Sequence, residues 1–330
     1  MRYILGIDQG GTKTAAAVMR EDGVIVGTAV AKGAYYPKHG IAPALDRIEE
    51  AVELAGKQAG IDRKDITVTV AGITGVDFPG DDKIMKDELG KRLVCGEITV
   101  CGDALIALYT VTGISHGMLI CAGTGMNGAI IDETGRQFVY GDYMEESMQG
   151  GSALALRALR KVFDAEMGLC GDTLLTELFL KHAGVATVDE LLRMYMTKPE
   201  FAEETRFLVP QILELAAQGD RETCRMTDAF AEQIVAYIFA GFNKMGMNPA
   251  REKIVLAGSV FKGKDNYLTR QIFKRIKERE PEATVVMAEY EPVVGACVMG
   301  LHLLHIGGEE VERNIAMSAK EKGLFLTDRK

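Results

Sequence analysis

The chain has 330 residues, of which 47% are hydrophobic and 26% are charged, and its formal net charge is −9. This composition is ordinary for a globular protein, and the length is enough for two domains with full cores. The acidic balance disfavours a nucleic-acid backbone as partner, and no apolar run approaches the roughly 20 residues of a membrane span. The first apolar run ends at Asp8, too early for a signal peptide, so we expect a cytoplasmic location.

The cysteines give no sign of a disulfide framework. They are scattered and include no C-x-x-C pair, and they lie at positions 95, 101, 121, 170, 224 and 297. We interpret them as reduced thiols of the core, as expected in the cytoplasm, with a metal or cluster site as the alternative.

The first part of the chain alternates short apolar runs with helical patterns. Ile41, Leu45, Ile48, Val52 and Ala55 recur at the spacing of one helix face. The elements expected up to residue 113 are, in chain order, strands near 2–8, 13–19 and 24–31, a helix over about 41–59, a strand at 66–72, a helix near 80–92, a strand at 97–101 and a helix at 103–112.

The pattern then restarts, which indicates a duplication. The stretch "GTKTAAAVMREDGVIVG" from Gly11 and the stretch "GTGMNGAIIDETGRQFV" from Gly123 share the order Gly-Thr, strand, acidic-Gly turn, strand. The elements expected after residue 113 are, in chain order, strands near 117–122, 126–132 and 136–140, a mainly helical stretch to about 246, a strand at 253–257, a helix at 265–279, a strand at 283–288, a helix at 292–305 and a charged tail.

The stretch "GIDQGGTKT" at residues 6–14 has the composition of a phosphate-binding turn. It matches neither G-x-x-x-x-G-K-[ST] nor G-x-G-x-x-G, and the sequence after it predicts a strand instead of a helix. Glycine lets the backbone approach phosphate oxygens without a Cβ clash, while threonine and lysine offer hydroxyls and a cation. The candidate phosphate-binding residues of this stretch are Gly10, Gly11, Thr12, Lys13 and Thr14.

Asp8 ends the first predicted strand, directly before these glycines. A carboxylate there can hold the water shell of Mg²⁺ beside a triphosphate, because Mg²⁺ prefers one or two carboxylates plus phosphate oxygens. The duplicated hairpin repeats the device with Gly123, Thr124 and Gly125, so a phosphate chain could lie between two such hairpins. The alternatives are a turn-forming Asp8, a solvated Lys13 and a plain second hairpin.

Two further strand ends carry candidate residues. Asp103 follows an apolar strand end and precedes the helical stretch "ALIALYTV", which makes it a candidate catalytic residue. A helix N-cap is the alternative role for this aspartate. In "VLAGSVF", Gly258 and Ser259 would let an adenine and a ribose lie close to the backbone. An ordinary strand-to-helix turn is the alternative there.

Together these motifs resemble those of the acetate and sugar kinase, Hsc70 and actin superfamily. Within it, the chain resembles the N-acetylglucosamine kinase and BadF/BadG/BcrA/BcrD ATPase family. The matching motifs are, in order, the first phosphate motif "GIDQGGTKT", the first connecting segment "VAGITG" (70–75), the Asp-Ala of "CGDALIALY" (101–109), the second phosphate motif "ICAGTGMNG" (120–128), the adenosine motif "VLAGSVF" (255–261) and the second connecting segment "PVVGA" (292–296). Each motif alone is weak, whereas six in this order are specific.

The resemblance implies an α/β fold with two duplicated ribonuclease H-like (actin-like ATPase) domains around a nucleotide cleft. We expect an N-terminal domain over 1–113 and a C-terminal domain over 114–330, with a helical insertion at about 152–246 and a final helix able to pack back on the N-terminal domain. The resemblance also implies ATP and Mg²⁺ as cofactors and Asp103 as the catalytic residue, which takes the proton of the acceptor hydroxyl. The small residues Gly295 and Ala296 would allow a close helix crossing, consistent with a hinge between the domains.

The expected acceptor residues depart from the N-acetylglucosamine kinase pattern. Those kinases carry an Asn in the loop after the third strand, whereas this loop reads "KGAYYPKHG". Gln149 stands where they carry an Asp, Met126 replaces a Ser, and the chain has no Trp. The candidate substrate residues are Tyr36, Asn127, Tyr143, Gln149 and Gly151.

These features predict a kinase that transfers the γ-phosphoryl group of MgATP to a hydroxyl of a small molecule, an amino sugar or sugar derivative. The missing carboxylate partner predicts poor use of N-acetylglucosamine itself. The alternative is an ATPase or nucleotide-binding regulator of the BadF/BadG family, although the cysteines do not match the cluster-binding pattern of dehydratase activators. We expect a homodimer, a small-molecule substrate, and no nucleic-acid or membrane partner.

Overall fold

The structure is a computed structural model that describes residues 1–93, 95–263 and 265–326. By compactness the chain divides into two units. The first unit comprises 1–119, 129–139 and 286–330, and the second comprises 120–128 and 140–285. Compactness thus groups the closing segment from residue 286 with the N-terminal part of the chain, whereas the sequence analysis placed this segment in the C-terminal domain.

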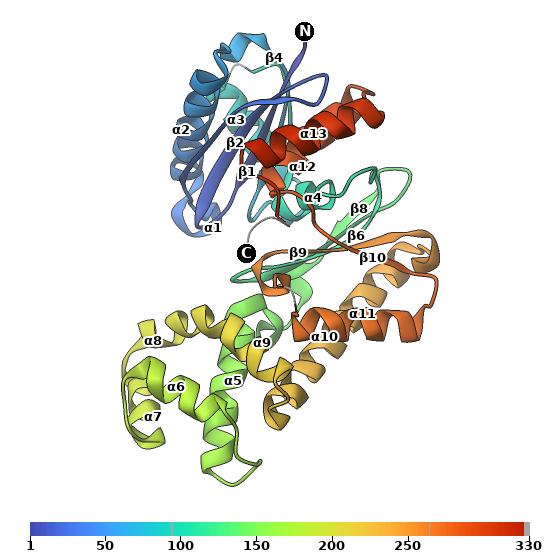
Figure 1. Ribbon diagram of the computed structural model, residues 1–330. Coiled ribbons are helices and arrows are strands. Elements are labelled where there is room, and N and C mark those ends of the chain that lie inside the picture. The colour runs from blue at the N-terminus through green and yellow to red at the C-terminus, as the bar shows by residue number, and fades with distance from the viewer. Residues whose placement is uncertain (94, 264, 327–330) are drawn as a thin grey trace. The chain divides into compact units, whose positions relative to one another are not determined.

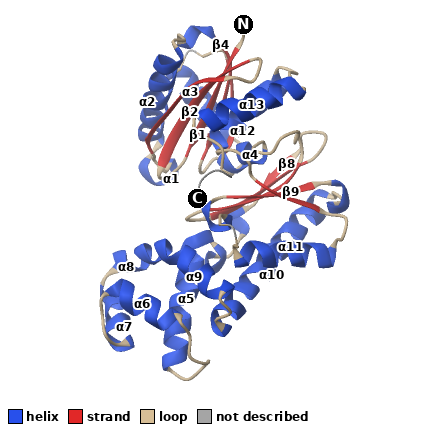
Figure 2. Cartoon of the chain, in the orientation of Figure 1, coloured by secondary structure: helices blue, strands red, loops and turns tan. Residues whose placement is uncertain are grey.

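The first unit contains a five-stranded sheet with the order β3-β2-β1-β4-β5 (Figures 1 and 2). Strand β1 is antiparallel to β2 and parallel to β4, β2 is antiparallel to β3, and β4 is parallel to β5. The strands are β1 (Tyr3–Gln9), β2 (Lys13–Arg20), β3 (Ile25–Lys32), β4 (Ile66–Ile73) and β5 (Glu97–Gly102).

Helices cover both faces of this sheet (Figure 1). Strand β1 shows why, since Leu5 and Ile7 belong to the core on the face of α2, whereas Ile4 belongs to the core beside α12. The helices of the first unit are α1 (Tyr36–His39), α2 (Ile41–Ala59), α3 (Asp81–Arg92), α4 (Asp103–Leu108), α12 (Pro292–Leu303) and α13 (Glu309–Glu321). Near α13, the hydroxyl oxygen of Ser318 accepts a hydrogen bond of 3.0 Å from the backbone N–H of Ile25 in β3.

Helix α12 packs against β1 and α4 at very short range because glycines lie at both contacts. A Cβ on Gly6 in β1 would lie 2.6 Å from Cys297 Sγ, and a Cβ on Gly295 would lie 2.1 Å from the carbonyl oxygen of Ile106. The close helix crossing predicted at Gly295 is therefore confirmed. The hinge role of this region stays a prediction.

A second five-stranded sheet has the order β10-β9-β6-β7-β8, in which β7 and β8 are antiparallel. Its strands are β6 (Gly117–Ala122), β7 (Met126–Ile131), β8 (Gln137–Val139), β9 (Lys253–Ala257) and β10 (Thr284–Met287). The β6–β7 hairpin carries the duplicated Gly-Thr motif, so the two copies of the motif each lie on a hairpin, as the sequence predicted.

The second unit is mainly helical, as Figure 2 shows. Its helices are α5 (Gly150–Glu166), α6 (Leu175–Ala183), α7 (Val188–Thr197), α8 (Pro199–Glu204), α9 (Val209–Ala217), α10 (Arg221–Met245) and α11 (Tyr267–Arg279). The 3₁₀ turns of the chain are η1 (Arg63–Asp65), η2 (Gly141–Tyr143), η3 (Glu146–Met148), η4 (Thr205–Leu208), η5 (Pro249–Arg251) and η6 (Ser259–Phe261).

Two elements differ from the sequence-based expectation. Helix α4 ends at Leu108, four residues earlier than predicted, and the Thr110 hydroxyl then donates to the carbonyl of Ala107 at 2.6 Å. Helix α1 was not predicted, because one turn is too short to show a periodicity. All six cysteines are free thiols. None of the described helices is long and apolar enough to cross a membrane.

Candidate active site

The predicted metal and catalytic residues of the first unit lie at one edge of its sheet. In the strand register, Asp8 of β1 is opposite Gly72 of β4, and Ile73 of β4 is opposite Gly102 of β5. The carboxyl ends of β1, β4 and β5 therefore lie at the same edge of the sheet, which is where α/β proteins bind ligands. Asp8 and Asp103 come from two of these ends, and Thr74 directly follows the third.

Asp8 is buried, with 8% of its surface exposed, and its carboxylate has no hydrogen-bond donor among the described residues. Burial raises the pKa of Asp8 to about 7. The Lys13 ammonium opposes this rise, whereas the Asp103 and Glu291 carboxylates add to it. In its ionised form, this buried carboxylate without a hydrogen-bond donor in the described part of the chain would be stabilised by a cation beside it.

Lys13 supplies the nearest positive charge of the cluster. Its ammonium donates to Glu291 Oε2 at 2.7 Å, and its own side chain is 48% exposed. Glu291 is the N-cap residue of α12 and is itself buried. Lys13 is thus an exposed side chain with an ion-pair partner, and the choice between a phosphate contact and a solvated charge stays a prediction.

The turn of the first hairpin is open to ligand. The Gly10 N–H donates to the Lys13 carbonyl at 2.9 Å, and Gly11 and Thr12 are exposed. A Cβ on Gly11 would have Tyr35 Cβ as its nearest neighbour, at the ordinary contact distance of 3.7 Å, so the protein leaves room for a further group at this position. Thr14 differs, because it is fully buried and its hydroxyl donates to the carbonyl of Lys32 at 3.1 Å. We therefore leave the Thr14 hydroxyl out of the candidate phosphate contacts.

Asp103 is the first residue of α4, and the N-cap position is taken by Gly102. Burial raises the pKa of Asp103, while hydrogen bonds from the Thr74 side chain and the Ala104 backbone N–H act in the opposite direction. The carboxylate thus combines burial with a donor from the neighbouring strand end. Its position is not that of a conventional N-cap, which favours the predicted catalytic role over the capping role.

Tyr36 lies beside the same strand ends. Its hydroxyl donates to the carbonyl of Gly75 at 2.7 Å, and Gly75 is next to Thr74 in the chain. Burial raises the pKa of Tyr36 to about 12, and the carboxylates of Asp81 and Asp77 contribute to the rise. The structure therefore holds Tyr36 on the segment that also carries Thr74, the hydrogen-bond donor to Asp103, and places two acidic side chains near the Tyr36 hydroxyl.

The second hairpin is joined to the start of α5. The carbonyl of Gly123 accepts from the N–H of Gly151 at 2.8 Å, and the carbonyl of Thr124 accepts from the N–H of Ser152 at 3.1 Å. A Cβ on Gly123 would find its nearest neighbour, Ser259 Oγ, at 4.0 Å. The candidate phosphate residues of this hairpin therefore present an uncovered surface.

Asn127 and Gln149, both predicted as substrate residues, hold the second unit's own backbone. Asn127 Oδ1 accepts from the N–H groups of Gly128 and Gly141, each at 2.8 Å. Gln149 Nε2 donates to the Gly141 carbonyl at 3.2 Å, and its Oε1 accepts from the Met126 N–H at 3.4 Å. Both amides thus tie the loop after β8 to the hairpin, and their contact with a substrate stays a prediction.

A cavity of about 240 Å³ adjoins the second hairpin. Its lining residues come from the hairpin, from α5, from η4 and α9, and from η6: they are Gly123, Thr124, Gly151, Arg206, Phe207, Val209, Pro210, Ser259 and Val260. The Arg206 guanidinium lies 4.7 Å from the centre of the Phe207 ring, which is 63% exposed. An aromatic ring with a cation beside it suits a stacked base.

Gly258 does not line this cavity but shapes it. Its φ is +102°, and a Cβ there would lie 2.2 Å from the carbonyl oxygen of Ala122. The turn after β9 can therefore approach the end of β6 only with glycine at this position. Ser259 is brought to the cavity wall as a result.

The sequence of the chain matches a known protein family. The model of the BadF/BadG/BcrA/BcrD ATPase family matches residues 5–300. The chain belongs to the BadF/BadG/BcrA/BcrD ATPase family. The predicted resemblance is confirmed, and the matched range includes all six motifs as well as both candidate hairpins.

Individual relatives of this family member are distant but nearly full length. Glucosamine kinase GspK of Vibrio cholerae is 24% identical over 285 residues, which cover 86% of the chain and 93% of the relative. A candidate N-acetylglucosamine kinase from Chromobacterium violaceum has a similar structure, with a TM-score of 0.67, 20% identity, and coverage of 91% of the chain and 99% of that protein. A ROK family glucokinase from Streptomyces griseus, solved with glucose and AMPPNP, gives a TM-score of 0.57, 21% identity, and coverage of 90% and 98%. These likenesses confirm the predicted two-domain α/β fold.

The sequence analysis did not predict several residues of the candidate site. Thr74 lies within the "VAGITG" segment and Glu291 directly precedes "PVVGA", so their position in or next to a motif was the only signal for them. Arg206 and Phe207 lie in the helical stretch, where no motif marks them. Tyr143, a predicted substrate residue, is 73% exposed.

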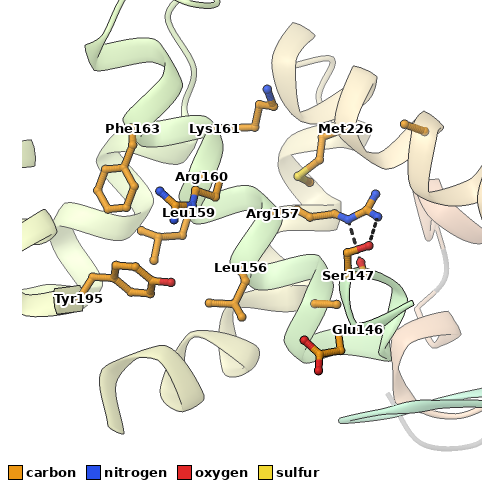
Figure 3. A pocket seen from close by; sticks show the side chains of 12 residues that line it. Glu146, Ser147, Leu156, Arg157, Leu159, Arg160, Lys161, Phe163, Tyr195 and Met226 are labelled. Atoms are coloured by element: carbon orange, nitrogen blue, oxygen red, sulfur yellow. Dashed lines mark hydrogen bonds between the residues drawn. The ribbon is translucent and has the colours of Figure 1, made fainter. Parts of the chain in front are cut away.

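A larger cavity of about 540 Å³ lies elsewhere in this family member, among α5, α7 and α10 (Figure 3). Arg157 crosses its wall and donates to the carbonyl of Ser147 at 2.8 Å and to its hydroxyl at 3.1 Å. Leu156, Leu159 and Phe163 point into the same region from α5. The predicted site residues do not line this cavity, so size alone does not identify the candidate active site.

Proposed function

We propose that this protein is an ATP-dependent kinase that transfers the γ-phosphoryl group to a hydroxyl of a small sugar, with amino sugars as the substrate class. The observation that carries the proposal is the Asp103 carboxylate at the sheet edge, partly buried and held by the Thr74 hydroxyl. Phosphoryl transfer needs positioning, charge stabilisation and a base that orients the attacking hydroxyl. The first unit offers such a base near a buried carboxylate, that of Asp8.

The relatives support the same reaction class. The similar protein from Vibrio cholerae and the two similar solved structures are named as kinases of glucosamine, N-acetylglucosamine and glucose. The family name specifies ATP as the nucleotide. We carry the acceptor class over from these proteins and the nucleotide from the family.

The residues of the chain fit MgATP. Asp8 offers a buried carboxylate without a hydrogen-bond donor among the described residues, which suits the water shell of Mg²⁺. The open glycine turns at Gly11 and Gly123 suit phosphate oxygens, and the cavity beside Ser259 suits the nucleoside. Bound Mg²⁺ would neutralise charge on the phosphates.

In the proposed mechanism, Asp103 accepts a hydrogen bond from the acceptor hydroxyl and takes its proton as the hydroxyl oxygen attacks the γ-phosphorus. The bond between this phosphorus and the bridging oxygen breaks in the same step, and ADP leaves with the electron pair. The Thr74 hydroxyl keeps this carboxylate oriented and stabilises its ionised form. Tyr36 presents its ring near the same carboxylate, where it can pack against an apolar sugar face. Exclusion of water protects the phosphoryl group from hydrolysis.

An ADP-release assay across a sugar panel tests this function. The panel contains glucosamine, N-acetylglucosamine, glucose, other hexoses and polyols, and each is compared by kcat/KM. We expect turnover with an amino sugar and a lower kcat/KM for N-acetylglucosamine, because Gln149 replaces a carboxylate partner. If N-acetylglucosamine is the best acceptor, the inferred selectivity is wrong. Fast hydrolysis that no acceptor stimulates would instead make the protein an ATPase.

A further inference from the structure

The four charged side chains at the edge of the first sheet do not balance in charge. Asp8, Asp103 and Glu291 are carboxylates, and Lys13 is the cation that acts on Asp8 together with them. Asp8 and Glu291 are 8% and 7% exposed, so bulk water does little to compensate their charges. When all four are ionised, two negative charges stay uncompensated. One divalent cation would neutralise them.

The two buried carboxylates of this cluster, Asp8 and Glu291, interact with the Lys13 ammonium in different ways. Glu291 Oε2 accepts its hydrogen bond at 2.7 Å, whereas Asp8 interacts with it only electrostatically. Asp8 has no other donor among the residues that the structure describes. A buried charged group without such a partner is costly. The Lys13 ammonium therefore interacts with both carboxylates, as a bound metal ion would.

The geometry points to Glu291 as the second carboxylate of the divalent-cation site, with Asp8 as the first and Lys13 as the internal cation that pairs with Glu291 when no metal is bound. This inference rests on the proposed function, because MgATP is the ligand that brings the metal. Two carboxylates are what Mg²⁺ needs, since water and phosphate oxygens complete its octahedron. Consistent with this, the described residues contain no cage of three or more His, Cys, Asp or Glu.

The arrangement also assigns a second position to Lys13. Its side chain is 48% exposed and lies at the start of β2, next to the open turn at Gly11 and Thr12. Once a metal ion takes over the charge of Glu291, the Lys13 ammonium is released and can reach a phosphate oxygen. The metal ion and the Lys13 ammonium therefore compete for the Glu291 carboxylate, so removing the lysine should raise the metal affinity of the site.

Binding of Mn²⁺ to the nucleotide-free protein tests the competition. Mn²⁺ replaces Mg²⁺ at oxygen ligands, and electron paramagnetic resonance reports the free ion directly. We expect Lys13→Met to bind Mn²⁺ at least tenfold more tightly than the natural chain, because the competing ammonium is gone. We expect Glu291→Gln to bind it at least tenfold more weakly. The double variant should lose the gain that Lys13→Met alone provides.

Glu289→Gln is the matched control. It makes the same change two residues away, on a side chain that accepts from the Thr112 hydroxyl at 2.8 Å and has no part in the cluster. This variant should bind Mn²⁺ like the natural chain. Thermal unfolding with and without Mn²⁺ checks that each variant folds, and the metal should raise the Tm of Lys13→Met most. Equal Mn²⁺ affinities of Glu291→Gln and Glu289→Gln would overturn the inference, as would an unchanged affinity in Lys13→Met.

The outcome is separable from that of the proposed function. If the natural chain phosphorylates a sugar while Glu291→Gln keeps its Mn²⁺ affinity, the kinase assignment stands and the role of Glu291 is wrong. If Mn²⁺ binding follows the expected order while no sugar in the panel is phosphorylated, the cation site stands and the acceptor class is wrong.

Discussion

The β1–β2 and β6–β7 hairpins carry copies of one motif, yet their surroundings differ in charge. The first hairpin has Asp8, Lys13 and Glu291 around its turn, all within one electrostatic cluster. Near the second hairpin the polar side chains are neutral amides, since Gln149 and Asn127 form hydrogen bonds with backbone groups around the Gly123 turn. The duplicated backbone was thus kept while the chemistry of the two copies separated.

This difference assigns different tasks to the two copies. A charged, buried cluster suits metal binding and proton transfer, because burial shifts pKa values and strengthens electrostatic interactions. The second hairpin is neutral, is joined to the start of α5 and adjoins a cavity with an aromatic ring. This environment suits nucleotide binding, and the described residues that line the cavity offer no carboxylate for proton transfer or metal binding. We therefore expect substitutions near the first hairpin to alter turnover and pH dependence. Substitutions near the second should alter nucleotide affinity.

The largest effect is expected for Asp103→Asn at the charged edge. The variant keeps the shape of the side chain but cannot take the proton, so we expect kcat to fall by roughly 10²-fold or more. Nucleotide affinity, measured by calorimetry, should change little. Near-normal turnover with the best acceptor would leave Asp103 with a structural role only.

The next largest effect is expected for Gly123→Val at the neutral hairpin. The position has room for a side chain, since a Cβ would be 4.0 Å from its nearest neighbour, so the fold should be retained. The valine would take the space of the phosphates, and we expect nucleotide affinity to fall by about tenfold or more, on the scale of a lost charge-assisted contact. Gly11→Val makes the same test at the first hairpin.

Gly150→Ala serves as the opposite control for this pair. Gly150 has a φ of +60°, and a Cβ there would lie 2.1 Å from the Gly125 carbonyl oxygen. We expect it to lower the Tm, because both the backbone and the packing oppose a side chain. Unchanged MgATP affinity in both valine variants would contradict the phosphate assignment.

A smaller effect, with a definite sign, is expected from Thr74→Val. The Thr74 hydroxyl lowers the pKa of Asp103 against the rise that burial causes. Without it the pKa rises further, so the acidic limb of kcat/KM should move to higher pH, since the base works only when ionised. The pH profile measures this shift. Thr134→Val, in the turn after β7, should leave the limb in place, and an unmoved limb in Thr74→Val would separate Thr74 from the base.

The smallest effect is expected for Tyr36→Phe. The variant loses one hydrogen bond, to the Gly75 carbonyl at 2.7 Å, which is worth about 0.5–1.5 kcal/mol. We expect a rise of a few-fold in the KM of the acceptor, with the KM of ATP unchanged. Tyr143→Phe is the counterpart in the second unit. A larger acceptor effect there would show that the exposed Tyr143 is the substrate contact after all.

Much of the fold was predictable because local patterns specify it. Helix α2 has the predicted bounds, since Leu45, Ile48 and Val52 all face one core. The site was predictable only where a motif marked it. Glu291 joins the cluster through its bond to Lys13, 278 residues away in the chain, and no local pattern encodes such a contact. Likewise, the hydrogen bonds of the Asn127 and Gln149 amides to backbone groups could not be predicted, because only the folded loop brings these groups near.

The packing of α12 against β1 has a consequence for how the protein is made. Ile4, Ala17 and Met19 share one core with Val293, Cys297 and Leu301, so one face of the first sheet is completed by residues synthesised long after its own strands. Until α12 leaves the ribosome, this apolar face has no cover, and contacts of such long sequence separation form slowly. Strands β1 and β2 must therefore wait, partly folded, until α12 has been made. Chaperone dependence and aggregation during synthesis should follow the arrival of α12 more closely than the final stability of the protein.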